Sequence, residues 1–228
     1  GFSAQAGGGA TWLDDDRIFF VTGNSGLKVV PARGGPIKPI WAIHPEDGIS
    51  DLHQPSPLPG TVGGLLVVHR REENGSALFG IDTLAVWKPT GEHHVIWRDP
   101  TSVVGRPVYC PSGHVLFQRG FETTEIWAVP FSLEKLARTG EPVRVADFGG
   151  VPSLSADGTL LFLTMSVGSF GPRQLAWVDR TGNLLSTLGP VLPGLSGPVI
   201  SPDQRRIAVV AGIESGPAAL NLWVCEVA

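Results

Sequence analysis

The sequence is poor in charge, in cysteine and in stretches free of glycine and proline. Only 17% of its 228 residues are charged, and the formal net charge is −4. The longest stretch without Gly or Pro, residues 10–22, has 13 residues. A membrane-spanning helix needs about 20 apolar residues, so we expect no membrane insertion by this segment.

These shortages exclude several classes of protein. Lys and Arg nowhere form the cluster that a nucleic-acid surface or a polybasic membrane anchor requires. Two cysteines, Cys110 and Cys225, are too few for a disulfide scaffold, and we expect both to be buried and unpaired. Hydrophobic residues nevertheless make up 42% of the chain, which excludes a disordered protein.

Glycine and proline, by contrast, are abundant and recur at regular places. A turn rich in Ser, Pro, Asp and Gly occurs five times, and aligned copies are 45, 53, 45 and 46 residues apart. Each turn is followed by an apolar strand, then a strand that in most copies contains Trp, then a Gly turn and a short strand. The apolar strands are RIFFV at 17–21, GLLVV at 64–68, HVLF at 114–117, TLLFL at 159–163 and RIAVV at 206–210.

Four antiparallel strands in a repeat of about 45 residues are typical of a β-propeller blade. One blade cannot bury its own two apolar faces, so blades must stack. The sequence therefore predicts an all-β fold, a single propeller fragment spanning residues 1–228. Its repeats lie at approximately 8–41, 53–97, 105–146, 149–189 and 196–228. The last repeat lacks its fourth strand, and we interpret both ends as cuts in a longer protein, part of a larger propeller.

Several motifs resemble those of a known family. SPDQRRIA at 201–208 is similar to the turn and strand of the TolB-like or WD40-like (PD40) propeller repeat. The order of GGATW at 8–12, VPARGG at 30–35, WAVPF at 127–131, TGEPV at 139–143 and WVDRTG at 177–182 resembles the propeller region of bacterial eukaryote-like serine/threonine protein kinases. Gln204, where Gly is usual, is a departure confined to a turn.

The resemblance implies a non-catalytic module that binds a protein, peptide or small ligand and serves as the extracytoplasmic sensor of a signalling kinase. The chain itself contains no kinase motif, so we expect it not to be an enzyme and to need no cofactor. The alternative is the propeller of a TolB-like or prolyl-oligopeptidase-type hydrolase whose catalytic domain is absent. The open edges of an incomplete propeller also allow self-association.

Six histidines are the first candidates for a metal site. None of them shows a metal-binding spacing, and His93 and His94, as neighbours in a strand, point to opposite faces. A structural hydrogen bond is the expected role of His53, just before a turn. The acidic turn at 14–16 lacks the pattern of a calcium loop and is interpreted as a solvated hairpin tip. We therefore assign no metal ligand.

Catalytic and binding residues are equally hard to assign. Ser196 in GLSG at 194–197 does not fit the nucleophile elbow of α/β-hydrolases, and an inter-blade turn is the expected role of this segment. Because the seven tryptophans follow the repeat, most should pack between blades. No catalytic or cofactor-binding residue is predicted, and the ligand-binding residues stay unknown.

Overall fold

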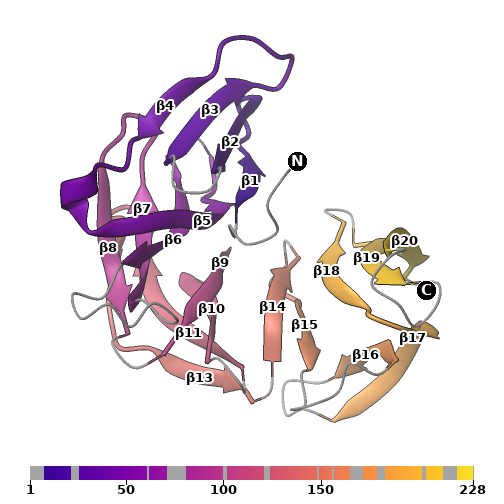
Figure 1. The fold of residues 1–228 in the computed structure, drawn as a ribbon. Coiled ribbons are helices and arrows are strands. Elements are labelled where there is room, and N and C mark those ends of the chain that lie inside the picture. The colour runs from indigo at the N-terminus through magenta and orange to yellow at the C-terminus, as the bar shows by residue number, and fades with distance from the viewer. Residues whose placement is uncertain are drawn as a thin grey trace. The chain divides into compact units, whose positions relative to one another are not determined.

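The structure is a computed structural model in which nearly all regular structure is β-strand (Figure 1). It describes residues 8–21, 26–60, 62–70, 81–99, 102–120, 124–147, 149–155, 157–164, 172–178, 183–201, 204–212 and 220–227. Within these ranges the one helix is the short 3-10 helix η2 (Pro45–Asp47), and none is long and apolar enough to cross a membrane. The chain, which the sequence analysis treats as one fragment, divides into two compact units, Gly1–Asp147 and Phe148–Ala228.

The first unit contains three antiparallel sheets (Figure 1). Two have four strands in sequence order, and the third has β11 paired with both β12 and β13. We call them sheets 1, 2 and 3. Sheet 1 is β1 (Gly9–Trp12), β2 (Arg17–Val21), β3 (Leu27–Pro31) and β4 (Lys38–Trp41). Sheet 2 is β5 (Ile49–Pro57), β6 (Gly64–Arg70), β7 (Ile81–Trp87) and β8 (His93–Arg98). Sheet 3 is β9 (Val104–Cys110), β10 (His114–Arg119), β11 (Glu125–Ser132), β12 (Ala137–Arg138) and β13 (Val143–Ala146).

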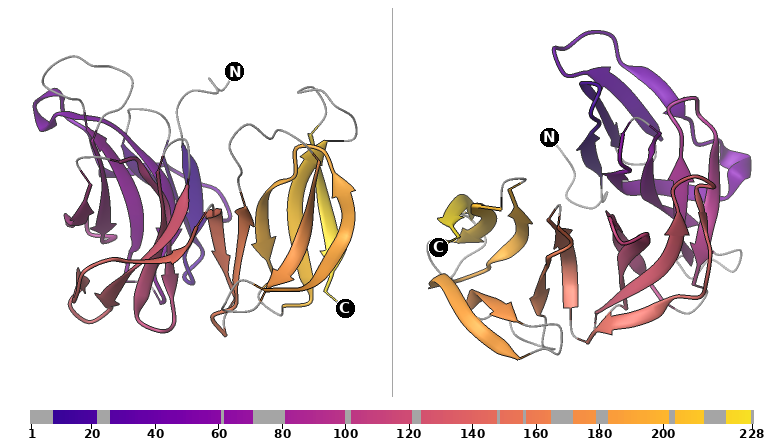
Figure 2. Two further views of the ribbon diagram at one scale, coloured as in Figure 1. Left: turned by 90° about the horizontal axis from the view of Figure 1, so that it is seen from below. Right: turned by 180° about the vertical axis from the view of Figure 1, so that it is seen from behind.

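The second unit contains two sheets of two strands each and one sheet of three strands (Figure 2). β14 pairs with β15, β16 with β17, and β19 lies between β18 and β20. Its core is a separate apolar cluster that includes Leu175, Ile207 and Val209. The strands are β14 (Gly149–Leu154), β15 (Leu160–Thr164), β16 (Arg173–Val178), β17 (Leu184–Leu192), β18 (Ser196–Ile200), β19 (Arg206–Gly212) and β20 (Leu220–Glu226).

Sheet 2 is buried on both faces. Side chains alternate between the two faces of a strand, and alternate residues of β6 enter two different cores. Leu66 and Val68 pack with sheet 1, whereas Leu65 and Val67 pack with sheet 3, and all four are 0% exposed. The apolar run at 64–68 therefore predicts two-sided burial correctly, and sheets 1 and 3 stack on opposite faces of sheet 2.

Two-sided burial does not extend to every apolar strand. In β2, Phe19 and Val21 are buried, but Ile18 and Phe20 are only partly covered. The tryptophans differ as well: Trp41 and Trp87 are buried, while Trp12 is 57% exposed. In the second unit Trp223 lies on the exposed strand β20. Five of the seven tryptophans lie in or against the apolar clusters, as expected for most of them, and Trp12 and Trp223 are the exceptions.

The glycine pair at the start of β6 makes room for the largest buried side chain. Trp87 is 0% exposed and packs on Phe19, with 4.5 Å between ring centroids. A Cβ at Gly64 would lie 2.7 Å from the Trp87 ring, and a Cβ at Gly63 would clash with the Trp87 carbonyl oxygen. Gly63 also has a φ of +137°, which residues with a side chain rarely adopt. Both positions therefore require glycine.

Replacing Gly63 with alanine should lower the free energy of unfolding by about 3 kcal/mol or more, because backbone strain and a steric clash act together. Gly34, with a φ of +85° and open space around it, is the matched control. Gly34→Ala should cost about 1 kcal/mol from the left-handed conformation alone. Urea unfolding followed by tryptophan fluorescence measures both, and equal losses would contradict the steric argument.

An ion pair with a buried carboxylate joins sheet 2 to sheet 3. The Asp99 carboxylate, 3% exposed, accepts a hydrogen bond from Arg119 Nε at 2.5 Å. The Arg119 guanidinium also lies over the Trp127 ring, 4.6 Å from its centroid. Asp99 follows β8 and Arg119 ends β10, so the pair joins two sheets.

Arg119→Ala should destabilise the protein by about 2–4 kcal/mol, because it removes the ion-pair partner of a buried carboxylate. Arg138 pairs with Glu141 on the surface, where the two side chains are 43% and 82% exposed. Arg138→Ala should change stability by less than about 1 kcal/mol. The comparison is made from urea midpoints, and a similar loss in both variants would show that Asp99 does not depend on Arg119.

Candidate functional site

The first strands of successive repeats share a bulge whose key residue precedes a proline. Gln54, Arg106 and Val151 have φ values of 54°, 50° and 53°, and Pro55, Pro107 and Pro152 follow them. The strand pairing shifts register at each of these places, and also between Ser196 and Val199, which flank Gly197-Pro198. A left-handed conformation at a residue other than glycine costs about 1–3 kcal/mol and is common at functional sites.

The sequence analysis missed this bulge, although a signal was present. The four pre-proline residues, at 54, 106, 151 and 197, are 52, 45 and 46 residues apart. This is the period of the repeat, so a search for periodic prolines would have found them.

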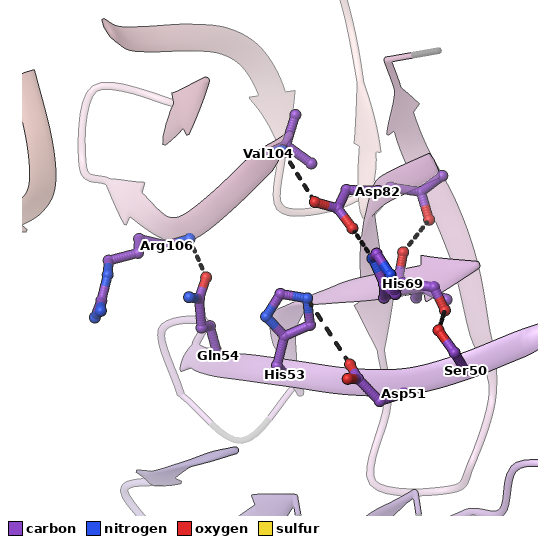
Figure 3. A network of polar contacts seen from close by, with 10 residues as sticks. Ser50, Asp51, His53, Gln54, His69, Asp82, Val104 and Arg106 are labelled. Atoms are coloured by element: carbon purple, nitrogen blue, oxygen red, sulfur yellow. Dashed lines mark hydrogen bonds and ion pairs between the residues drawn. The ribbon is translucent and has the colours of Figure 1, made fainter. Parts of the chain in front are cut away.

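In the first unit the bulges of β5 and β9 lie next to each other (Figure 3). Gln54 Oε1 accepts a hydrogen bond of 2.5 Å from the backbone N–H of Arg106. A Cβ at Gly105 would lie 2.9 Å from the same oxygen, so this contact needs glycine there. The Arg106 side chain is exposed, yet surrounding protein desolvates the guanidinium and lowers its pKa. No carboxylate among the described residues forms an ion pair with it.

A second group of polar side chains lies beside this bulge. His69 in β6 faces Asp82 in β7, with 2.5 Å between Nδ1 and Oδ1. The other carboxylate oxygen of Asp82 accepts a hydrogen bond of 3.3 Å from the Val104 N–H in β9. Asp82 is 3% exposed, and its hydrogen bond raises the pKa of the His69 imidazole. This chain of contacts joins sheet 2 to sheet 3.

His53 completes the group from β5. The side chain is only 16% exposed, and burial lowers the pKa of its imidazole. Its Nε2 lies 3.9 Å from Asp51 Oδ1, too far for a hydrogen bond. That buried carboxylate oxygen has no hydrogen-bond partner within the described part of the chain. His53 lies in a bulge within β5, not immediately before a turn as the sequence analysis places it.

Three of these residues bring possible metal ligands together. One ligand atom each from His53, His69 and Asp82 lie within 4.8 Å of one another. They are the one such group of three among the residues that the structure describes. The sequence does not predict this group, because its members are 16 and 13 residues apart on three strands whose register the spacing does not reveal.

The other sequence candidates lie elsewhere. Asp15 pairs with Arg17, and Asp14 accepts a hydrogen bond from the Gly60 N–H, so both carboxylates bind protein groups. His93 stacks on Trp41, whereas His94 Nε2 contacts the Leu136 carbonyl at 2.7 Å. Their opposite orientation is confirmed.

The remaining candidate residues lie in strands and hairpins outside this group. Ser196 begins β18. Cys110 and Cys225 are free, the first buried and the second partly exposed. Ser112 Oγ lies 3.1 Å from His114 Nδ1, but both belong to one tight hairpin, and that nitrogen also faces the Ser112 carbonyl. No acid orients this pair among the described residues, so it is not a catalytic triad of the serine-hydrolase type.

A cavity of about 510 Å³ lies in the first unit, away from these groups. Its lining includes Trp41, Arg70 and His93, next to the outer strands of sheets 1 and 2. The Arg70 guanidinium already donates to the Asp47 carbonyl. The cavity brings together no set of reactive or ligating groups comparable to that around His53.

Comparisons with known proteins agree on the fold. The chain matches no protein-family model and no curated protein sequence. Among solved structures, it is similar to TolB from Acinetobacter baumannii, with a TM-score of 0.65 and 17% identity over 96% of this chain and 53% of that one. It is also similar to the calcium-binding protein regucalcin from Agrobacterium tumefaciens, with a TM-score of 0.66 and 14% identity over 95% of this chain and 76% of that one.

A third similar structure is puromycin hydrolase, with a TM-score of 0.62 and 12% identity over 97% of this chain and 44% of that one. The chain thus spans about half the length of TolB and less than half of the hydrolase. Identities this low establish the fold alone, which is that of a β-propeller.

Proposed function

We propose that the chain is a non-catalytic β-propeller module that binds a protein, peptide or small ligand through Arg106. One observation carries the proposal: the Arg106 side chain is exposed and forms no ion pair among the described residues, although its backbone is fixed in a strained conformation. An unpaired guanidinium is a binding group for carboxylate or phosphate, which it contacts through two parallel hydrogen bonds.

The surroundings of Arg106 support recognition of an anion. Gln54 holds the Arg106 backbone, and the glycine at 105 allows the close approach. The hydrogen bond from the Arg106 N–H to Gln54 offsets the free-energy cost of the strained backbone at Arg106, as expected at a binding site. The ligand class that fits is a carboxylate-bearing or phosphate-bearing molecule, such as a peptide with a free C-terminus.

The biological setting of the proposal rests on the sequence motifs. Their order resembles the propeller region that follows the kinase domain in bacterial serine/threonine protein kinases. On this basis the module is the sensor of a signalling kinase, located outside the cytoplasmic membrane. The sequence of the complete gene product, with or without a kinase domain and a membrane-spanning segment before residue 1, tests this part directly.

A second candidate is the propeller of a hydrolase. The likeness to puromycin hydrolase favours it, because this chain corresponds to only 44% of that protein. In that case the catalytic residues belong to a domain outside these 228 residues, and the propeller would contribute substrate binding alone.

The proposal is tested by comparing peptide binding to the wild-type protein with peptide binding to the Arg106→Ala variant. The probe is a fluorescein-labelled hexapeptide library with free C-terminal carboxylates, compared with the same library amidated. In fluorescence anisotropy, Arg106→Ala should reduce the affinity for the carboxylate library by about 10- to 100-fold, since a charge-assisted hydrogen bond contributes about 1.5–3 kcal/mol. Arg106→Lys should retain part of the affinity.

Arg138→Ala, which removes an exposed arginine elsewhere in sheet 3, is the control and should bind like wild type. Absence of carboxylate-dependent binding to the wild-type protein would overturn the proposal, as would unchanged affinity in Arg106→Ala. Mass spectrometry of the incubated library adds a further readout, and cleaved peptides would show that the chain is an enzyme.

A further inference from the structure

We propose that His53, His69 and Asp82 form a binding site for a divalent transition-metal ion of the Zn²⁺ type. The proposal does not depend on the binding role of Arg106. Each ligand comes from a different strand of sheet 2, namely β5, β6 and β7, so the backbone ladder holds the three side chains at fixed relative positions (Figure 3).

The donor set matches this class of ion. Two imidazole nitrogens and one carboxylate oxygen are ligands that Zn²⁺ binds at about 2.0–2.2 Å. Around a tetrahedral ion such ligand atoms are about 3.3 Å apart. The ligand atoms here lie within 4.8 Å of one another, and His69 Nδ1 and Asp82 Oδ1 are 2.5 Å apart. Binding an ion therefore requires that His69 and Asp82 separate by about 0.8 Å and that His53 rotates toward them. Hard cations such as Mg²⁺ prefer oxygen ligands and fit less well.

Neighbouring groups orient the ligands as in known metal centres, where hydrogen bonds to the ligands fix their geometry. The Val104 N–H holds one oxygen of Asp82 and leaves the other facing His69. Ser50 Oγ donates to the His69 carbonyl at 3.0 Å and so fixes the strand at this ligand. The contact between His69 Nδ1 and Asp82 Oδ1 lies where the ion would bind, so metal binding would replace this contact.

Asp51 supplies the independent observation that points to a missing ligand. Its Oδ1 is buried without a hydrogen-bond partner among the described residues, in a side chain that is 27% exposed. A buried charged oxygen left without a hydrogen bond is costly. His53 Nε2 is 3.9 Å away. An ion beside His53 would neutralise this carboxylate, and the charges of Asp51 and Asp82 together balance a divalent cation.

A purely structural role explains only part of the group. The contacts of His69 with Asp82, and of Asp82 with Val104, fasten sheet 2 to sheet 3 in any case. They account neither for the buried position of His53 nor for the unpaired oxygen of Asp51. Three protein ligands leave a fourth position of a tetrahedral ion for water or a further ligand.

The site is tested with protein freed of metal by chelation. Isothermal titration with ZnCl₂ should show one ion per chain, and Co²⁺ in its place should give the visible absorption of tetrahedral coordination. MgCl₂ should give no comparable binding. His53→Ala should weaken Zn²⁺ binding by at least about 10-fold. Asp51→Asn should weaken it by about 10-fold, the low end of the effect of groups that support metal ligands.

Two control variants separate this site from other causes. His114→Ala removes a histidine in a surface hairpin and should bind Zn²⁺ like wild type. Arg106→Ala should also retain Zn²⁺, so failure of the peptide-binding proposal leaves the metal proposal intact. Because Asp51 Oδ1 has no hydrogen bond to lose among the described residues, Asp51→Asn should fold even if His53→Ala does not, which far-UV circular dichroism checks.

The outcomes are decisive in both directions. Stoichiometric Zn²⁺ binding that is lost in His53→Ala or Asp51→Asn, and kept in His114→Ala, supports the site. Zn²⁺ affinity weaker than about 100 μM (about −5.5 kcal/mol), or affinity that none of the variants at 51 and 53 changes, overturns it.

Discussion

The burial of sheet 2 on both faces is the constraint on which the first unit depends. Successive residues of β6 and β7 enter two separate cores, so neither face of the sheet can meet water without exposing a row of aliphatic side chains. Sheets 1 and 3 must therefore stack on it. A register shift of one residue would exchange the two faces, and the fully buried Trp87, which fits only against Gly63 and Gly64, opposes such a shift.

The polar side chains of His69 and Asp82 lie at the end of this apolar packing. In β6 the run from Leu65 to Val68 is fully buried, and the next residue is His69. Its cross-strand partner is Asp82, near the start of β7. Because stacking of sheets 2 and 3 brings β9 beside these strands, the Val104 N–H can reach the Asp82 carboxylate. The apolar cores thus determine the position of the polar residues, and buried hydrogen bonds keep those residues from costing stability.

Much of the fold could be predicted from the sequence, because hairpin turns and apolar strands are local signals. The repeat of strand and turn placed β6, β10 and β19 at their observed first residues, with ends two residues short of the observed ones. The site could not be predicted in the same way. Ligation by His53, His69 and Asp82 depends on the register of three paired strands, which no residue spacing along the chain reveals. The exposure of Trp12 and Trp223 was missed for a related reason, since burial depends on which sheet is stacked beside a strand.

Arg106 and Asp51 have opposite charges, and both act electrostatically on His53, yet they do not pair with each other. Strand geometry explains why. Asp51 and His53 are two residues apart in β5 and point to the same side, whereas the bulge at Gln54 changes the direction of the strand beyond them. Gln54 then fastens the backbone of Arg106 on the far side of that bulge. Because the two charges do not pair, each remains available to an external ligand, as the two proposals require.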